Sequence, residues 1–83
     1  MIPRAEHFKQ RLDAIIERAR KNGKSHIDVL SADLHADAGG FPSRNHRMPT
    51  CCSVMRQKMN PTDLVLYEPK KGAGATLKIR YIL

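Results

Sequence analysis

Tryptophan is absent from this sequence of 83 residues, phenylalanine and tyrosine occur twice each, and no hydrophobic run approaches the ~18 residues of a membrane-spanning helix. With only 83 residues and a hydrophobic fraction of 41%, we expect one small core and a single domain over residues 1–83. The N-terminal residues MIPRAEHFK carry charge too early for a secretory signal. We therefore expect a soluble, cytoplasmic protein with no membrane partner.

Cysteine is also scarce, and the two cysteines, Cys51 and Cys52, are adjacent. Adjacent side chains on a helix point about 100° apart, so a disulfide between them would be strained. No other cysteine is present to form a bridge, which is typical of a protein from a reducing compartment.

A metal site would have to combine this cysteine pair with His46 and one of His26, His35 or Met55. Structural zinc sites usually separate their cysteines by two to four residues, and a CC pair lacks that spacing. We therefore expect no metal and no cofactor. The cysteines should pack in the core beside Met55 and Met59, and the four histidines should be loop and surface residues.

Acidic residues are missing from one long segment, residues 41–62, which carries a charge of +4. The whole chain has a net charge of +7, residues 1–24 contribute +4, and only residues 25–40 are acidic, at −3. A basic protein with this distribution favours an anionic partner: nucleic acid first, then a membrane surface or an acidic protein.

Three helices are predicted from the spacing of hydrophobic residues and from helix-ending residues. The first spans Ile2 to Asn22, because Phe8, Leu12, Ile15, Ile16 and Ala19 share one face and Gly23 follows. The second begins at Ser31 as an N-cap and ends at Gly39-Gly40, with Leu30, Leu34 and Ala38 facing the core. The third, with Pro49 in its first turn, runs from Met48 or Thr50 to about Met59, before a turn at residues 60–63.

Three strands are predicted as well. SHIDVL, from Ser25 to Leu30, is short and rich in β-branched residues. Leu64–Glu68 and Ala75–Leu83 should form a C-terminal hairpin whose PKKGAG connection carries Lys70 and Lys71. The second of these strands shows the alternation of a half-buried strand, with Ala75, Leu77, Ile79, Tyr81 and Leu83 on one face and Thr76, Lys78, Arg80 and Ile82 on the other.

Catalysis has little support in the sequence. His35 lies two residues from Asp33 and from Asp37, and such positions on a helix diverge. The KKGAGAT segment lacks the order and spacing of a phosphate-binding loop. We expect that the protein is not an enzyme.

The predicted order is helix, short strand, helix, loop, helix and β-hairpin, which makes the fold class α+β. This order resembles the winged helix-turn-helix domain, with three helices, a short strand after the first helix, and a hairpin as the wing. The loop between the second and third helices, about eight to nine residues, is longer than that of a simple helix-turn-helix. The runs HIDVLSADLHADAGG, HRMPTCCSVM and KGAGATLKIRY also resemble a family of small, functionally uncharacterised bacterial proteins, and that likeness implies no activity.

The winged-helix resemblance implies that residues 50–59 form a recognition helix that enters the major groove of double-stranded DNA. Arg56 would pair with guanine, Gln57 with adenine, and Thr50 and Ser53 with bases or phosphates. Phosphate contacts would come from the loop before the helix and from the hairpin tip, through Arg44, Arg47, Lys70 and Lys71.

A different interpretation remains open at this point. Every amphipathic surface helix has a polar side, and winged domains often bind proteins. The alternative to DNA binding is therefore a protein–protein interaction module with the same fold. The charge pattern also leaves RNA or an acidic protein open as the partner of the basic face.

Overall fold

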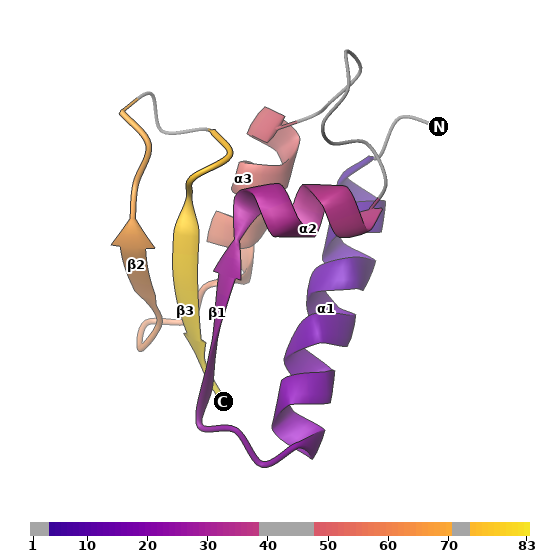
Figure 1. The fold of residues 1–83 in the computed structure, drawn as a ribbon, viewed down its shortest axis with the longest axis vertical. Helices are drawn as coiled ribbons and strands as arrows, with labels where there is room; N and C mark the ends of the chain where they lie inside the picture. The colour runs from indigo at the N-terminus through magenta and orange to yellow at the C-terminus, as the bar shows by residue number, and fades with distance from the viewer. Residues whose placement is uncertain (1–3, 39–47, 71–73) are drawn as a thin grey trace.

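The computed structural model describes residues 4–38, 48–70 and 74–83. Within these ranges it contains three helices and a three-stranded antiparallel sheet, so the predicted α+β class is confirmed (Figure 1). The elements follow the order α1 (Ala5–Lys21), β1 (His26–Leu30), α2 (Ser31–Ala38), α3 (Met48–Lys58), β2 (Leu64–Tyr67) and β3 (Lys78–Ile82).

Helix α1 forms around the predicted hydrophobic stripe. Phe8, Leu12, Ile16 and Ala19 are buried, and they recur at the three- and four-residue spacing of one helical face. Gly23, two residues after the end of the helix, takes a positive φ of 74°. The Gly23 N–H donates to the Arg20 carbonyl and the Lys24 N–H to the Ala19 carbonyl, the two bonds of a Schellman motif.

Helix α2 buries Ser31, Leu34 and His35. The prediction that all four histidines are loop or surface residues is wrong for His35, which is fully buried. Its ring meets the Phe8 ring edge-on, with centroids 4.9 Å apart. The reason is helical spacing, because position 35 lies one turn after Ser31 and next to Leu34 on the face that α2 turns toward α1.

The sheet has the order β1-β3-β2, so the last strand of the chain is its centre. β3 pairs antiparallel with β1, placing Asp28 opposite Arg80, and also with β2, placing Leu64 opposite Arg80. Leu77, Ile79 and Tyr81 are buried, as their alternation predicted. Lys78, Arg80 and Ile82 therefore lie on the opposite, outer face of the sheet.

The last strand is shorter than the predicted Ala75–Leu83, and the first hairpin strand ends at Tyr67 instead of Glu68. Backbone hydrogen bonds explain the late start of β3. The carbonyls of Leu77 and Ala75 accept hydrogen bonds from the N–H groups of Ser31 and Ala32, at 2.8 and 3.1 Å. This segment thus pairs with the start of α2 before it enters the sheet.

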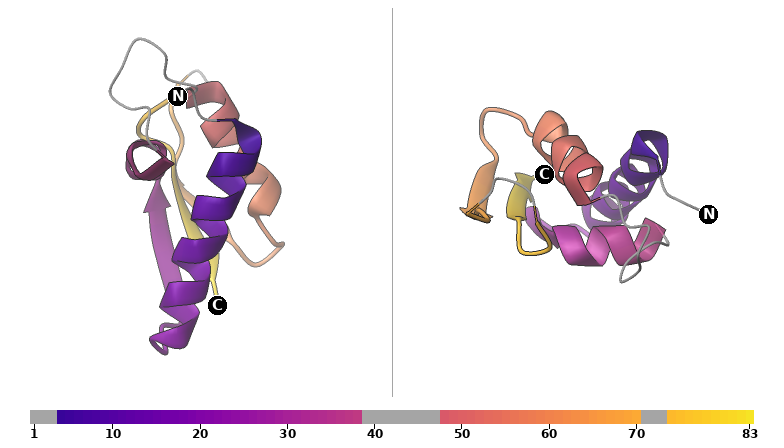
Figure 2. Two further views of the ribbon diagram at one scale, coloured as in Figure 1. Left: turned by 90° about the vertical axis from the view of Figure 1, so that its right-hand side faces the viewer. Right: turned by 90° about the horizontal axis from the view of Figure 1, so that it is seen from above.

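Helices α1 and α3 pack on the same face of the sheet, and α2 lies across the end at which β1 finishes (Figure 2). The core forms between these layers, and all three helices and the two strands β1 and β3 contribute side chains to it. It contains Phe8, Leu12, Ile16, Val29, Leu34, Met48, Cys51, Cys52, Val54, Met55, Leu77, Ile79 and Tyr81. β2, at one margin of the sheet, contributes none of these.

Candidate nucleic-acid interface

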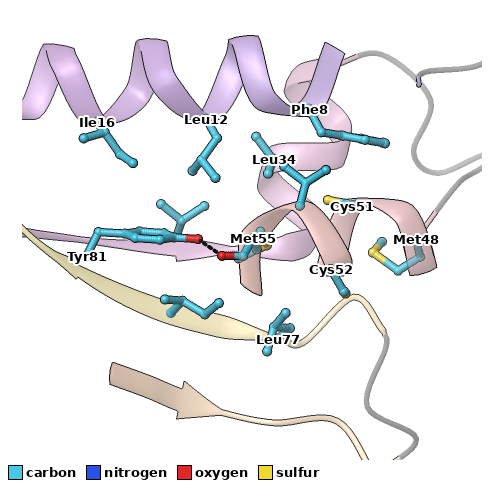
Figure 3. Close-up of a cluster of buried hydrophobic side chains, with 13 residues drawn as sticks. Phe8, Leu12, Ile16, Leu34, Met48, Cys51, Cys52, Met55, Leu77 and Tyr81 are labelled. Carbon is cyan, nitrogen blue, oxygen red and sulfur yellow. Dashed lines mark hydrogen bonds between the residues drawn. The ribbon is translucent and has the colours of Figure 1, made fainter. Parts of the chain in front are cut away.

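Helix α3 is fixed by an inner face of sulfur-containing and aliphatic residues. Cys51, Cys52 and Met55 are buried, which confirms that the cysteine pair packs in the core (Figure 3). Val54 is buried as well. Met59, just beyond the helix, is partly buried against the same cluster. Because this face is held by the core, the other side of α3 is turned outward.

The outward side of α3 carries the predicted polar row. Ser53 and Gln57 are exposed, and Thr50 is half-buried. The Gln57 side-chain amide donates to the Ser53 hydroxyl at 3.3 Å, one turn earlier on the helix. The structure therefore brings Thr50, Ser53 and Gln57 onto one accessible surface that offers both donors and acceptors.

Arg56 connects α3 to the end of β2. Its Nη2 donates to Oε1 of Glu68 at 2.9 Å, with 34% of the Arg56 side chain and 59% of the Glu68 side chain exposed. Sequence reasoning assigned Arg56 to a base and gave Glu68 no role. The pair places a carboxylate directly beside the predicted guanine-binding residue.

The C-terminal end of α3 is held by two buried groups from outside the helix. The Tyr81 hydroxyl donates to the Met55 carbonyl at 2.9 Å (Figure 3). The carboxylate of Asp63 accepts hydrogen bonds from the backbone N–H groups of Asn60 and Ile82, both at 2.8 Å. These bonds satisfy a carbonyl in the last turn of α3, an N–H group of the following turn and an N–H group of β3. They also fix α3 relative to β3.

The thiol groups connect α3 to the start of α2 and to the root of the β2–β3 connection. Cys51 donates to the Ser31 carbonyl at 3.6 Å, and Cys52 donates to the Gly74 carbonyl at 3.3 Å. The Ser31 hydroxyl, expected to cap α2, donates instead to that same Gly74 carbonyl at 2.5 Å. Burial raises the pKa of the Cys51 thiol to about 12. A thiol in this state is a packing group and a poor nucleophile.

The acidic segment of the chain does not form a bare acidic surface. Asp28 accepts two hydrogen bonds from Arg80, at 2.8 and 3.1 Å, and these lower the pKa of Asp28 below its ordinary value. Asp37 is paired with Arg11 at 2.7 Å. The expected separation of acidic and basic segments is thus partly cancelled by contacts between them.

Most carboxylates in the described ranges form ion pairs or hydrogen bonds within the chain. Of the eight acidic residues in the sequence, five form ion pairs with arginine or lysine: Asp13, Glu17, Asp28, Asp37 and Glu68. A sixth, Asp63, accepts backbone hydrogen bonds. Because the chain has 15 basic residues and only eight acidic ones, these internal pairs leave a surplus of positive charge.

Lys58 was the basic residue expected to lay its stem along the apolar side of α3 with its amine in water. The structure places it over α1, where its Nζ lies 2.7 Å from the Asp13 carboxylate. Lys58, Asp13, Lys9 and Gln57 line a groove of about 260 Å³ between the two helices. Sequence reasoning did not include Lys9, because only the packing of α1 on α3 brings it close to the outward side of α3.

Three predicted site residues, Arg44, Arg47 and Lys71, lie outside the described ranges. Lys70, at the end of a described range, is exposed. His46, the histidine proposed for a metal site, is also outside these ranges. In the part of the chain that the structure describes, no three histidine, cysteine, aspartate or glutamate residues are grouped to hold a metal ion.

No protein-family model, curated protein or solved structure gives a significant match to this chain. Among the described residues, none of the helices combines the length and the hydrophobicity needed to cross a membrane.

Proposed function

We propose that this chain is a winged-helix domain that binds double-stranded DNA, with α3 in the major groove and the β2–β3 connection as the wing. The order α1-β1-α2-α3-β2-β3, with β3 central in the sheet, supports this assignment. In such a domain the third helix is the one that reads base edges.

The observation that carries the proposal is the two-sided character of α3. Its inner face is buried through Cys51, Cys52 and Met55, while Ser53 and Gln57 on the outward side are exposed. A helix anchored in this way can enter the major groove without losing its own packing. The surrounding segment, residues 41–62, carries four basic residues and no acidic one, which suits the phosphate backbone.

The side chains on α3 have the chemistry for direct readout. A glutamine amide matches the donor and acceptor of adenine, and an arginine guanidinium matches the two acceptors of guanine. Gln57 and Arg56 are the residues to which we assign these contacts, with Thr50 and Ser53 supporting them. In this proposal Arg56 breaks its ion pair with Glu68 when it binds the base.

An amide-shift titration of the labelled chain with mixed-sequence duplex tests the proposal. We expect the resonances of Thr50, Ser53, Arg56 and Gln57 to move. Arg56→Ala should weaken binding by about 5- to 160-fold, which corresponds to the ~1–3 kcal/mol of one bidentate contact. The matched control is Arg20→Ala, because Arg20 is also paired with a glutamate, Glu17 at 2.8 Å, but lies in the last turn of α1.

If Arg56→Ala and Arg20→Ala weaken DNA binding equally, the affinity depends only on net charge, and this result contradicts a role for α3. If the duplex moves none of the α3 resonances, DNA binding is wrong, and the protein–protein interaction module becomes the function of this fold. Thermal unfolding of both variants checks that a lost interaction is not a lost fold.

A further inference from the structure

The exposed hydrophobic residues of this protein are concentrated in one place. Among the described residues, every exposed large hydrophobic side chain lies on β2 or at Ile82 of β3. Leu64 and Tyr67 are the most accessible, at 53% and 56%, and Val65 and Leu66 between them are also exposed. An 83-residue protein with a small core has little reason to leave a complete strand of this composition in water.

β2 is also an edge strand. The sheet order β1-β3-β2 leaves one side of β2 without a strand, and β2 lies at the outer margin of the molecule in both Figure 1 and the top view of Figure 2. Edge strands are usually protected by lysine, proline or a bulge. A bulge between Val65 and Tyr67 is present, but no charged residue or proline occurs within Leu64–Tyr67.

We propose that β2 is a self-association edge, which pairs antiparallel with β2 of a second copy of this chain and so joins two sheets into one of six strands. The pairing is isologous, since the same strand is used by both copies. It does not depend on DNA binding.

The strand is complementary to itself in this arrangement. With the two-fold axis between Val65 and Leu66, Leu64 of one copy faces Tyr67 of the other. Leu64 and Tyr67 pair with Arg80 and Lys78 of β3, so both lie on the outer face of the sheet. Ile82, two residues beyond Arg80, extends the same face. The β2–β2 junction between the two copies therefore contains two contacts between Leu64 and Tyr67, one on each side of the two-fold axis. No like charges face each other within the strand.

The charge around β2 also permits two copies to approach. Residues 59–69 contain Asp63 and Glu68 and no basic residue, although the chain carries +7. The register brings these two carboxylates opposite each other across the junction. Asp63 is already held by the N–H groups of Asn60 and Ile82, and Glu68 by Arg56. Their charge is thus compensated inside each copy.

The other edge strand, β1, is a poor candidate for the same role. Its central residue is Asp28, so pairing β1 with itself around that position would oppose two carboxylates. Asp28 is engaged by Arg80, and only His26 of this strand is exposed. The self-pairing edge is therefore β2. Because β2 is short, the dimer interface buries less than the usual ~800 Å² per partner. The dimer should therefore form only as the protein concentration rises.

Analytical ultracentrifugation without nucleic acid, from low micromolar to millimolar protein, tests the proposal. We expect the wild type to shift from monomer to dimer across this range. Leu64→Glu and Tyr67→Lys, each made alone, should raise the dissociation constant at least about tenfold by placing a charge in the apolar junction. The double variant should recover dimerisation, because the register places each new carboxylate opposite a new ammonium group.

Ala14→Glu and Ala14→Lys are the matched controls, since Ala14 is exposed on α1 and the charge changes are the same. Both should dimerise like the wild type. A wild-type chain that stays monomeric at all concentrations would overturn the proposal and leave β2 for a strand of another protein. Dimers that persist in both single variants, or a double variant that stays monomeric, would overturn the β2 pairing.

Discussion

Replacing Glu68 by glutamine removes the carboxylate that holds Arg56 and should strengthen DNA binding. In the free protein Arg56 Nη2 lies 2.9 Å from Glu68 Oε1, so the guanidinium that we assign to a guanine is occupied by an internal acid. The pair must separate before Arg56 can reach a base. Glu68 also adds a negative charge beside the surface that would face the phosphates.

The size of the effect follows from the exposure of the pair. Exposed ion pairs contribute about 0.2–1 kcal/mol, and this pair is partly exposed at both ends. A carboxylate about 8 Å from a phosphate adds roughly 0.5 kcal/mol of repulsion in water. Together these amount to about 0.7–1.5 kcal/mol, so we expect Glu68→Gln to tighten DNA binding by about 3- to 12-fold.

Fluorescence anisotropy with a mixed-sequence duplex measures this change. The control is Glu17→Gln, which alters net charge equally and breaks an ion pair, Glu17–Arg20, that is formed within α1 and includes no residue of α3. We expect Glu17→Gln to tighten binding less than twofold. The reasoning is refuted if Glu68→Gln weakens binding, leaves it unchanged, or acts no more strongly than Glu17→Gln.

Three further predictions concern the groups that hold α3 in place. Tyr81→Phe removes the donor to the buried Met55 carbonyl, so the free energy of unfolding should fall by about 1–2 kcal/mol and the Tm by roughly 5–10 °C. An unchanged melting curve would show that this hydrogen bond adds no stability. Burial raises the pKa of Cys51 to about 12 and raises that of Tyr81, so the folded state keeps protons that the unfolded chain loses. Urea titrations from about pH 8 to about pH 10.5 should show stability falling above about pH 9, where the unfolded Cys51 thiol ionises, toward a slope of about 1.4 kcal/mol per pH unit, and Tyr81 should add to this slope only above about pH 10. Cys51→Ala should remove the part of this slope that begins near pH 9, and a flat profile in the wild type would contradict the assignment. Ser31→Ala removes the donor to the Gly74 carbonyl and should lower stability by about 0.5–1.5 kcal/mol in the same titrations, a smaller loss than for Tyr81→Phe because Cys52 also donates to that carbonyl.

Local patterns in the sequence were sufficient to predict the helices and the burial within β3. The apolar stripe of α1, the glycine that ends it, and the alternation of Leu77, Ile79 and Tyr81 all depend on residues a few positions apart. The outward position of Ser53 and Gln57 on α3 follows from the same helical geometry. These features require no knowledge of what packs against them.

Contacts between distant segments could not be predicted in this way. Asp28 and Arg80 are 52 residues apart, and Arg56 and Glu68 lie on different elements. Their pairing changes the electrostatics that the charge pattern implied, since an acidic segment becomes largely neutralised. The buried position of His35 likewise depends on α1, which supplies Phe8 as its neighbour. Composition alone gave no sign that β2 would be exposed along its whole length.

The salt dependence of duplex binding tests the central claim most directly. If α3 and the basic segments around it bind DNA, the logarithm of the affinity should fall linearly with the logarithm of the salt concentration, with a slope of about 0.9 for each phosphate neutralised. Arg56→Ala should bind more weakly at every salt concentration, while Arg20→Ala keeps close to the wild-type affinity. Absence of binding at low salt, or an affinity that does not change with salt, would contradict DNA as the partner of this domain.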